Sequence, residues 1–198
     1  KMAPVGIGLI ALLASSATAL AGPLHDAASV GDVGQVAALL SQGGDINARS
    51  DRGETPLILA ILAGHDEVAE LLIEEGAALD GRNVGGFTPL HAAAYAGDTA
   101  LTEFLIAKGA DIHDAQNKAS VTPLFVAAEE DHKAVAELLI ARGAEIEVKE
   151  RHGYTILTRT TFKEHEDMIA LLKSHGAECQ PPEVMGEASH RTCMGVGN

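Results

Sequence analysis

Apolar residues between residues 23 and 178 fall into short blocks separated by polar connections. Each block opens with a dense run of small and aliphatic residues, such as "LILAILA" from Leu57 to Ala63. In a second run, apolar residues recur three and four positions apart, as at Val68, Leu71 and Leu72. A polar stretch such as "DINARSDRGE" then leads to the next block. The pattern predicts repeated pairs of short helices joined by polar loops.

Two markers recur with one period along these blocks. The tripeptide Thr-Pro-Leu begins at Thr55, Thr88 and Thr122, and a degenerate copy begins at Thr155, so the intervals are 33, 34 and 33 residues. An earlier copy begins in the same phase at Pro23. We therefore expect five units, each burying its apolar face against its neighbours. The second marker, a glycine after the second apolar run, recurs at Gly43, Gly76, Gly109, Gly143 and Gly176.

The residues around each Thr-Pro-Leu suit the two ends of a short helix. A threonine such as Thr55 can cap the first free backbone amides, and Pro56 suits the first helical position because its missing N–H is not needed there. A glycine such as Gly64 or Gly97 can end the helix in a left-handed conformation. We expect a second helix after that glycine.

One unit reads "GGFTPLHAAAYAG", from Gly85 to Gly97, and resembles the ankyrin repeat, whose family signature is G-x-TPLHxAAxxGH followed by V-x-x-LL-x-x-GA-x-x-N. The resemblance covers residues 23–178. It implies an all-α repeat solenoid of about five helix-turn-helix units joined by β-hairpin-like loops. It also implies a protein–protein interaction module without enzymatic activity or cofactor. The expected units are residues 22–52, 53–85, 86–118, 119–151 and 152–178, followed by a C-terminal tail at residues 179–198.

Three features depart from the family pattern. The connection from His113 to Val121 carries one extra residue, so we expect that loop to have a different shape. Asp131 replaces the glycine between two helices, which predicts strain or an altered turn there. Arg159, Thr160 and Thr161 replace alanines and aliphatic residues in the last unit, where we expect them to face solvent at the end of the array.

Residues 1–21 resemble an export signal. A basic residue precedes a nine-residue apolar run from Val5 to Leu13, and Ala19-Leu20-Ala21 offers the small-x-small pattern of signal peptidase sites. The run is far shorter than the roughly 20 residues needed to span a bilayer. We expect cleavage after Ala21 and a periplasmic or secreted protein; retention as an uncleaved anchor is the alternative.

The charge of the chain restricts its partners. The formal net charge is −14, and cleavage after Ala21 would leave 13 basic and 28 acidic residues. Phosphate backbones and anionic membrane surfaces repel such a chain, so we expect neither as a partner. The expected partner is an unidentified protein, and the chain is expected to be a monomer without membrane attachment after cleavage.

His91 raises the question of catalysis. The resemblance places it at a histidine position that ties neighbouring turns together, and the equivalent residues in the other units are His25, Ile58, Phe125 and Thr158. A position that takes isoleucine and phenylalanine is a packing position. The chain also lacks a nucleophile elbow or a phosphate-binding glycine loop. "HEDMIALL" from His165 has Ile169 where a zinc protease has its second histidine, so we interpret it as an amphipathic helix.

The only two cysteines, Cys179 and Cys193, lie in the tail. For an exported chain we expect a disulfide, which would close a loop of 15 residues and hold a Pro-Pro extension over the last unit. A metal site using His175 and His190 is a second interpretation, because both histidines stand at ligand-like spacings from the cysteines. A redox-active pair is a third.

The family binds partners through its hairpin tips and the concave side of its first helices, and two rows of residues fall there. The residue before each threonine is Glu54, Phe87, Val121 or Tyr154, and the residue near the end of each first helix is Ser29, Leu62, Tyr95, Glu129 or Phe162. These rows hold four of the six aromatic residues, and exposed aromatic residues often anchor interfaces. Basic residues at the tips are expected to help bind an acidic partner or to keep the loops soluble: Arg49, Arg52, Arg82, Lys118, Lys149 and Arg151.

The sequence therefore predicts an exported ankyrin array that binds a protein. The alternative is a redox-active or metal-binding module whose chemistry lies in the tail with Cys179 and Cys193.

Overall fold

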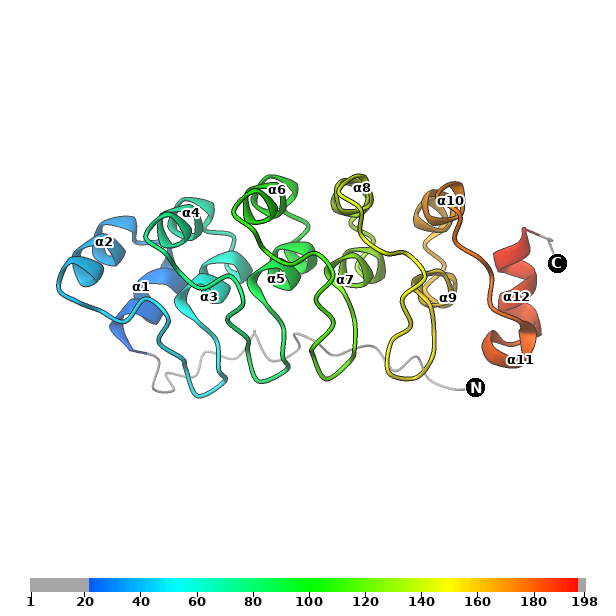
Figure 1. The fold of residues 1–198 in the computed structure, drawn as a ribbon, viewed down its shortest axis with the longest axis horizontal. Coiled ribbons are helices and arrows are strands. Elements are labelled where there is room, and N and C mark those ends of the chain that lie inside the picture. Colours follow the sequence, from blue (N-terminus) through cyan, green and yellow to red (C-terminus); the bar gives the residue numbers. More distant parts are fainter. Residues whose placement is uncertain (1–21, 196–198) are drawn as a thin grey trace. The chain divides into compact units, whose positions relative to one another are not determined.

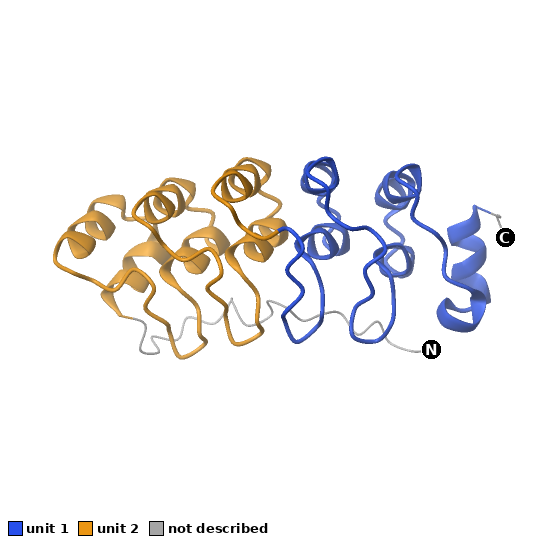
Figure 2. Ribbon diagram, in the orientation of Figure 1, with its two compact units in different colours: residues 1–4, 112–198 blue, residues 5–111 orange. Residues whose placement is uncertain are grey.

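The computed structural model describes residues 22–195, so the expected export signal at residues 1–21 lies outside the described part. Within this part the chain forms twelve helices and no strand, with one isolated bridge between Lys149 and Thr155. None of these helices has the length and apolar character needed to cross a membrane. The chain divides into two compact units, here called the N-terminal unit (residues 22–111) and the C-terminal unit (residues 112–195) (Figure 2).

The N-terminal unit contains three helix pairs. The first helices α1, α3 and α5 pack side by side, and α2 packs against α4 in a second row (Figure 1). Within each pair the second helix also packs on the first. The helices are α1 (Pro23–Val30), α2 (Val33–Ser41), α3 (Pro56–Leu62), α4 (Asp66–Glu74), α5 (Pro89–Ala96) and α6 (Thr99–Ala107).

The C-terminal unit contains two helix pairs and a helical tail. First helix α7 packs against α9, and second helix α8 packs against α10. In the tail, α12 packs against α9 and therefore covers the last repeat. The helices are α7 (Pro123–Glu129), α8 (Lys133–Ala141), α9 (Ile156–Phe162), α10 (Glu166–Ser174), α11 (Pro182–Met185) and α12 (Glu187–Met194).

The first helices start and stop as the sequence predicts. Thr55 Oγ1 accepts a hydrogen bond from the Ile58 amide at 3.3 Å, and Pro56 occupies the first turn. Gly97 ends α5 in the left-handed conformation, with φ at 73°. Each cap of this kind contributes about 1 kcal/mol to stability, which matters because an isolated helix of seven or eight residues is not stable in water.

The core is built from the periodic apolar positions. The leucines of the Thr-Pro-Leu motif and its degenerate copy are almost fully buried, as are four apolar residues of the second helices. Helices this short cannot bury such residues alone, so neighbouring pairs provide the core of each unit. The leucines are Leu57, Leu90, Leu124 and Leu157, and the second-helix residues are Leu72, Leu105, Leu139 and Leu172.

The polar loops are closed by one side chain at the start of each turn. Asn83 Oδ1 accepts hydrogen bonds from the amides of Gly85 at 2.9 Å and Phe87 at 3.0 Å. The Asn83 amide in turn donates to Phe87 O at 3.1 Å. Side-chain acceptors of this kind stabilise a turn locally. The four loop-closing residues are Ser50, Asn83, Asn117 and Glu150.

The extra residue of the third loop does not alter its turn. Asn117 Oδ1 accepts from the amides of Ala119 and Val121, which is the bonding pattern of the other loops. The spacing from Gly109 to Asn117 is one residue longer than the spacing from Gly76 to Asn83, so the insertion lies before the turn. The closing side chain sets the turn independently of the chain that leads to it, so the different shape expected for this loop does not extend to its turn.

Three left-handed positions of the C-terminal unit carry a residue other than glycine. Ser120, Asp131 and Glu164 have φ values of 58°, 62° and 59°, at positions where the N-terminal unit has glycine. A side chain in this conformation costs about 1–2 kcal/mol. The strain expected at Asp131 is therefore present, and it recurs at Glu164 one repeat later.

Candidate functional site

Three of the four residues that precede the threonines pack into the protein. Phe87 is 8% exposed and its ring meets the His91 ring edge-on, with 5.5 Å between centroids. Val121 is completely buried and Glu54 is 9% exposed. Their burial does not agree with the partner-binding role predicted for them. These three side chains offer almost no surface to a partner, whereas Tyr154, in the same row, stays half-buried.

The residues near the ends of the first helices differ from one another in exposure. Leu62 and Tyr95 are half-buried, and Phe162 is 37% exposed. Glu129 is an exception, because it is buried and its Oε1 accepts from Arg159 Nη2 at 2.5 Å. Lys163 Nζ also donates to Glu129 O at 2.7 Å. Glu129 therefore joins α7 to α9 and is not available as a binding residue.

In the C-terminal unit the half-buried Tyr154 contacts the exposed Phe162. The rings of Tyr154 and Phe162 meet edge-on with 5.3 Å between centroids. Both remain partly accessible, Tyr154 just before α9 and Phe162 as its last residue. The pair covers the last first helix, and Phe162 keeps the larger exposed surface.

A second exposed feature lies in the N-terminal unit, at the ends of α1, α3 and α5. Val30 is 69% exposed, and Ala63 and Ala96, at the equivalent positions, are also exposed. Together with the half-buried Leu62 and Tyr95 they form what we call the apolar row. Sequence reasoning missed Val30, Ala63 and Ala96, although each directly precedes a left-handed glycine and so stands at the exposed end of its helix.

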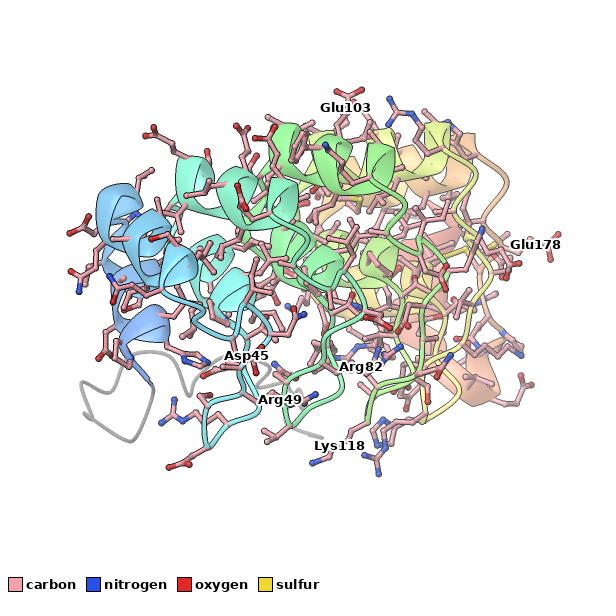
Figure 3. The ribbon with its side chains drawn as sticks, turned by 60° about the vertical axis from the view of Figure 1, so that its left-hand side comes forward. Asp45, Arg49, Arg82, Glu103, Lys118 and Glu178 are labelled. Atoms are coloured by element: carbon pink, nitrogen blue, oxygen red, sulfur yellow. A yellow bond between two sulfur atoms is a disulfide. The ribbon has the colours of Figure 1, made fainter. Side chains whose placement is uncertain are left out.

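The arginines of the loop tips take part in loop structure. Arg49 Nη2 donates to Arg82 O in the next loop, and Arg82 Nη1 donates to Gly86 O at 3.1 Å. Figure 3 shows Arg49 and Arg82 on the loop side of the N-terminal unit, with Glu103 of α6 on the opposite side. Both guanidinium groups thus hold loops in place, and their role towards a partner stays a prediction.

His91 helps to cap the N-terminus of α5. Its Nδ1 accepts from the Thr88 amide at 3.3 Å and lies 2.8 Å from Thr88 Oγ1, which completes a capping box. His25, at the same position in α1, uses Nε2 instead, which donates to Ala48 O at 3.0 Å and Glu54 O at 3.1 Å. Both histidines are almost fully buried. These contacts agree with a structural role for the position.

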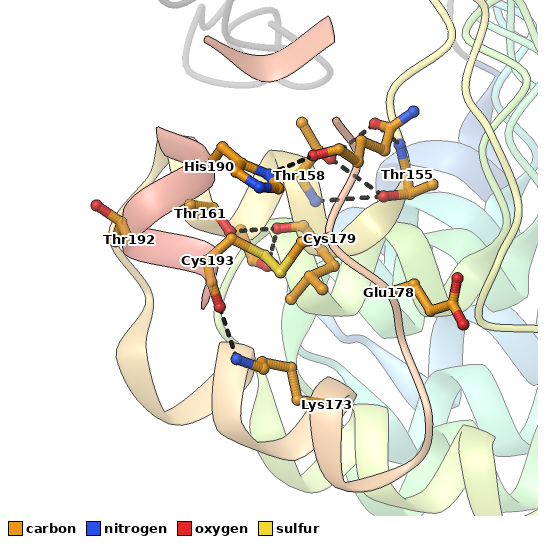
Figure 4. Close-up of a disulfide and its surroundings, with 12 residues drawn as sticks. Thr155, Thr158, Thr161, Lys173, Glu178, Cys179, His190, Thr192 and Cys193 are labelled. Atoms are coloured by element: carbon orange, nitrogen blue, oxygen red, sulfur yellow. Dashed lines mark hydrogen bonds between the residues drawn. A yellow bond between two sulfur atoms is a disulfide. The ribbon is translucent and has the colours of Figure 1, made fainter. Parts of the chain in front are cut away.

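The tail is closed by a disulfide between Cys179 and Cys193 (Figure 4). Lys173 Nζ donates to Cys193 O at 2.6 Å, which ties α12 to α10. His190 Nδ1 bonds to Gln180 O at 2.8 Å. The disulfide occupies both thiols, and residues 22–195 hold no group of three or more histidine, cysteine or acidic side chains placed to bind a metal ion. The metal and redox alternatives are therefore not favoured.

The polar residues of α9 lie beneath the tail. Thr158 and Thr160 are completely buried and Thr161 is 3% exposed, so the expectation that the threonines face solvent was wrong. Gln180 Oε1 accepts from Thr158 Oγ1 at 2.7 Å and from the Thr155 amide at 3.0 Å. The hydroxyls of Thr160 and Thr161 instead donate to Leu157 O, at 3.0 Å and 2.7 Å. Each buried hydroxyl of α9 thus has an acceptor, either in the tail or in the preceding turn of its own helix.

One carboxyl group beside the apolar row has a perturbed pKa. Desolvation raises the pKa of Asp66 above its ordinary value of 3.8, and the negative charge of Asp98 together with a hydrogen bond to it raises the pKa further. Asp98 Oδ1 also accepts from the Leu101 amide at 2.9 Å and so caps α6. Two carboxyl groups thus share one edge of the row.

The comparisons agree with this geometry. A family model for ankyrin repeats in three copies matches residues 24–116 and again residues 101–182. The chain belongs to the ankyrin repeat family. Ankyrin repeats in general mediate protein–protein interactions and are typically non-enzymatic. A search of the curated proteins found no match.

Proposed function

We propose that this ankyrin repeat protein is exported and binds another protein through the exposed ends of its first helices. The apolar row carries the proposal. Val30, Ala63 and Ala96 leave apolar surface in contact with water, and Leu62 and Tyr95 extend it. A large apolar side chain and an aromatic ring beside small residues suit the buried centre of an interface.

The binding proposal is tested by partner capture. The double variant Leu62→Ser and Tyr95→Ser removes the two largest side chains of the row, and capture of a protein from periplasmic extract is expected to be lost. The matched control is Val184→Ser with Met194→Ser, which changes two exposed apolar residues of the tail. Circular dichroism checks that both variants are folded. Unchanged capture by the first variant would contradict the proposal.

Export to the periplasm or beyond is the second part of the proposal. The pattern of residues 1–21 supports it, and so does pairing of the two cysteines, since disulfides persist in oxidising compartments. Cell fractionation with N-terminal sequencing tests it. The expected result is an extracytoplasmic chain that begins at Gly22. A cytoplasmic protein with two free thiols would refute export.

A further inference from the structure

The charge of the N-terminal unit restricts what can cover the apolar row. Residues 22–111 contain 14 acidic residues and only four basic ones. Arg49, Arg52 and Arg82 lie in the loops, and Lys108 lies at the end of α6 with its Nζ 5.0 Å from the centre of the Phe104 ring. Thus α1, α3, α5 and the turns that follow them carry no lysine or arginine.

Acidic residues border the row at the start of each second helix. Asp32 and Asp98 stand directly after the glycines that follow Val30 and Ala96, and Asp66 stands two residues after Gly64. Asp32 Oδ1 accepts from the Gln35 amide at 2.9 Å, so Asp32 and Asp98 are helix caps. Asp66 is different, because it is the first residue of α4 and His65 holds the N-cap position, without a side-chain cap hydrogen bond.

The Asp66 carboxylate lies close to other negatively charged side chains. Asp98 approaches it from the next repeat and Glu70 from its own helix, whereas the neighbouring His65 has the opposite effect. No arginine or lysine of the first helices lies nearby to offset this repulsion. A cation from outside would therefore gain attraction from two carboxylates beside an apolar surface.

We propose that the apolar row of the N-terminal unit binds a cationic amphipathic segment of the partner. Its apolar side chains cover Leu62 and Tyr95, and a lysine or arginine meets Asp66 and Asp98. The inference rests on the proposed function and specifies the partner's chemistry. An acidic partner would instead engage the arginines of the loops, and it forms the opposing outcome of the test.

The test uses two synthetic labelled peptides with the same leucine face. One peptide has lysines on its polar face and the other has glutamates. Fluorescence anisotropy with the full protein is expected to show binding of the lysine peptide that weakens as salt rises, because exposed charges are screened. Equal binding of both peptides, or preference for the glutamate peptide, would overturn the proposal.

Variants locate the site. Asp66→Asn with Asp98→Asn removes two charges and keeps the cap of α6, because asparagine caps helices as well as aspartate. The lysine peptide should bind about ten-fold more weakly to this variant. Glu74→Gln with Glu75→Gln removes the same charge at the opposite end of α4 and should change affinity little. Equal weakening in both variants would mean that only net charge matters and would overturn the proposal.

A further variant separates the row from its acidic edge. Ala63→Gln with Ala96→Gln places two larger polar side chains over the row. Both positions are exposed, so the variant should fold, and it should no longer bind the lysine peptide. The native partner distinguishes the two proposals. If capture requires Leu62 and Tyr95 but is unchanged by Asp66→Asn with Asp98→Asn, this inference fails while the proposed function stands.

Discussion

The same histidine position starts α1 and α5, but only one of the two helices has a complete cap. In α5, Thr88 pairs with His91 Nδ1, whereas in α1 the cap residue is Gly22 and His25 Nδ1 is buried without a hydrogen-bond partner. A Cβ on Gly22 would lie 3.9 Å from that nitrogen, which is ordinary contact, and its φ of −70° suits any residue. One missing hydroxyl therefore distinguishes the two helix starts.

Gly22→Thr should stabilise the protein by about 1 kcal/mol, because it supplies both a cap and a partner for the orphaned nitrogen. Urea denaturation of the full chain measures the change. Gly22→Val is the matched control, since valine has the shape of threonine without the hydroxyl. Equal stability of the two variants would show that the hydroxyl is not used.

Asp66 predicts a pH dependence. Its pKa is raised in the folded state, so the folded chain binds the proton more tightly than the unfolded chain, and stability falls as pH rises from about 3.8 through the raised pKa. Asp66→Asn removes this loss, so its stability relative to the parent protein should increase across that window. Thermal unfolding from pH 4 to pH 7 measures the difference. A difference that stays constant would contradict the prediction.

The sequence predicted the place of a residue in the repeat better than it predicted whether its side chain points into the protein or into solvent. The sequence places Phe87 and Glu129 correctly in the repeat, yet both are buried. Phe87 is turned inward by a hydrogen bond from its own amide to Asn83 Oδ1, and Glu129 by its partner Arg159, which stands 30 residues later. Neither contact follows from helical periodicity. The loop-closing residues Ser50, Asn83, Asn117 and Glu150 do repeat at intervals of 33, 34 and 33, so that signal was available.

At the scale of the elements, α12 takes the place of a further repeat by packing on α9. The sequence predicted a disulfide that holds a Pro-Pro extension over the last unit, but it did not predict that this extension is helical. Pro182 instead occupies the first turn of α11, where a proline fits.

Loss of the disulfide should loosen this cap. Cys179→Ser with Cys193→Ser removes a 15-residue closed loop, which the chain-entropy model values at about 3 kcal/mol. Urea denaturation should show this loss, and hydrogen exchange should increase in α9 and α12. The parent protein in reductant is the control and should match the double variant. If reduction leaves stability and exchange unchanged, the hydrogen bonds of Gln180 and Lys173 hold the tail without the bridge.

At the scale of the molecule, acidic charge works against folding. The N-terminal unit carries ten more acidic than basic residues, so its compact state repels itself, and salt should screen that repulsion. Raising sodium chloride from about 0.01 M to about 0.15 M should raise the melting temperature. The charge-reducing variant Glu74→Gln with Glu75→Gln should show a smaller rise. A melting temperature that falls with salt would contradict the prediction.

The repeat period predicted the family and the helix pairs because each unit restates the same capping and packing rules. It could not predict which surface binds, because binding residues occupy the positions that those rules leave free. Val30 shows this: its place before a glycine recurs at Ala63 and Ala96, but the repeat rules do not say that this position is exposed, and the structure does.

The bridge between Cys179 and Cys193 also changes how the tail responds to a protease. A single cut between these cysteines would leave both fragments covalently joined, so the nicked chain would keep its mass on a non-reducing gel. Only reduction would release the end of the chain. The tail can thus be cleaved at its exposed turn at Gly186 and still remain attached to the last repeat.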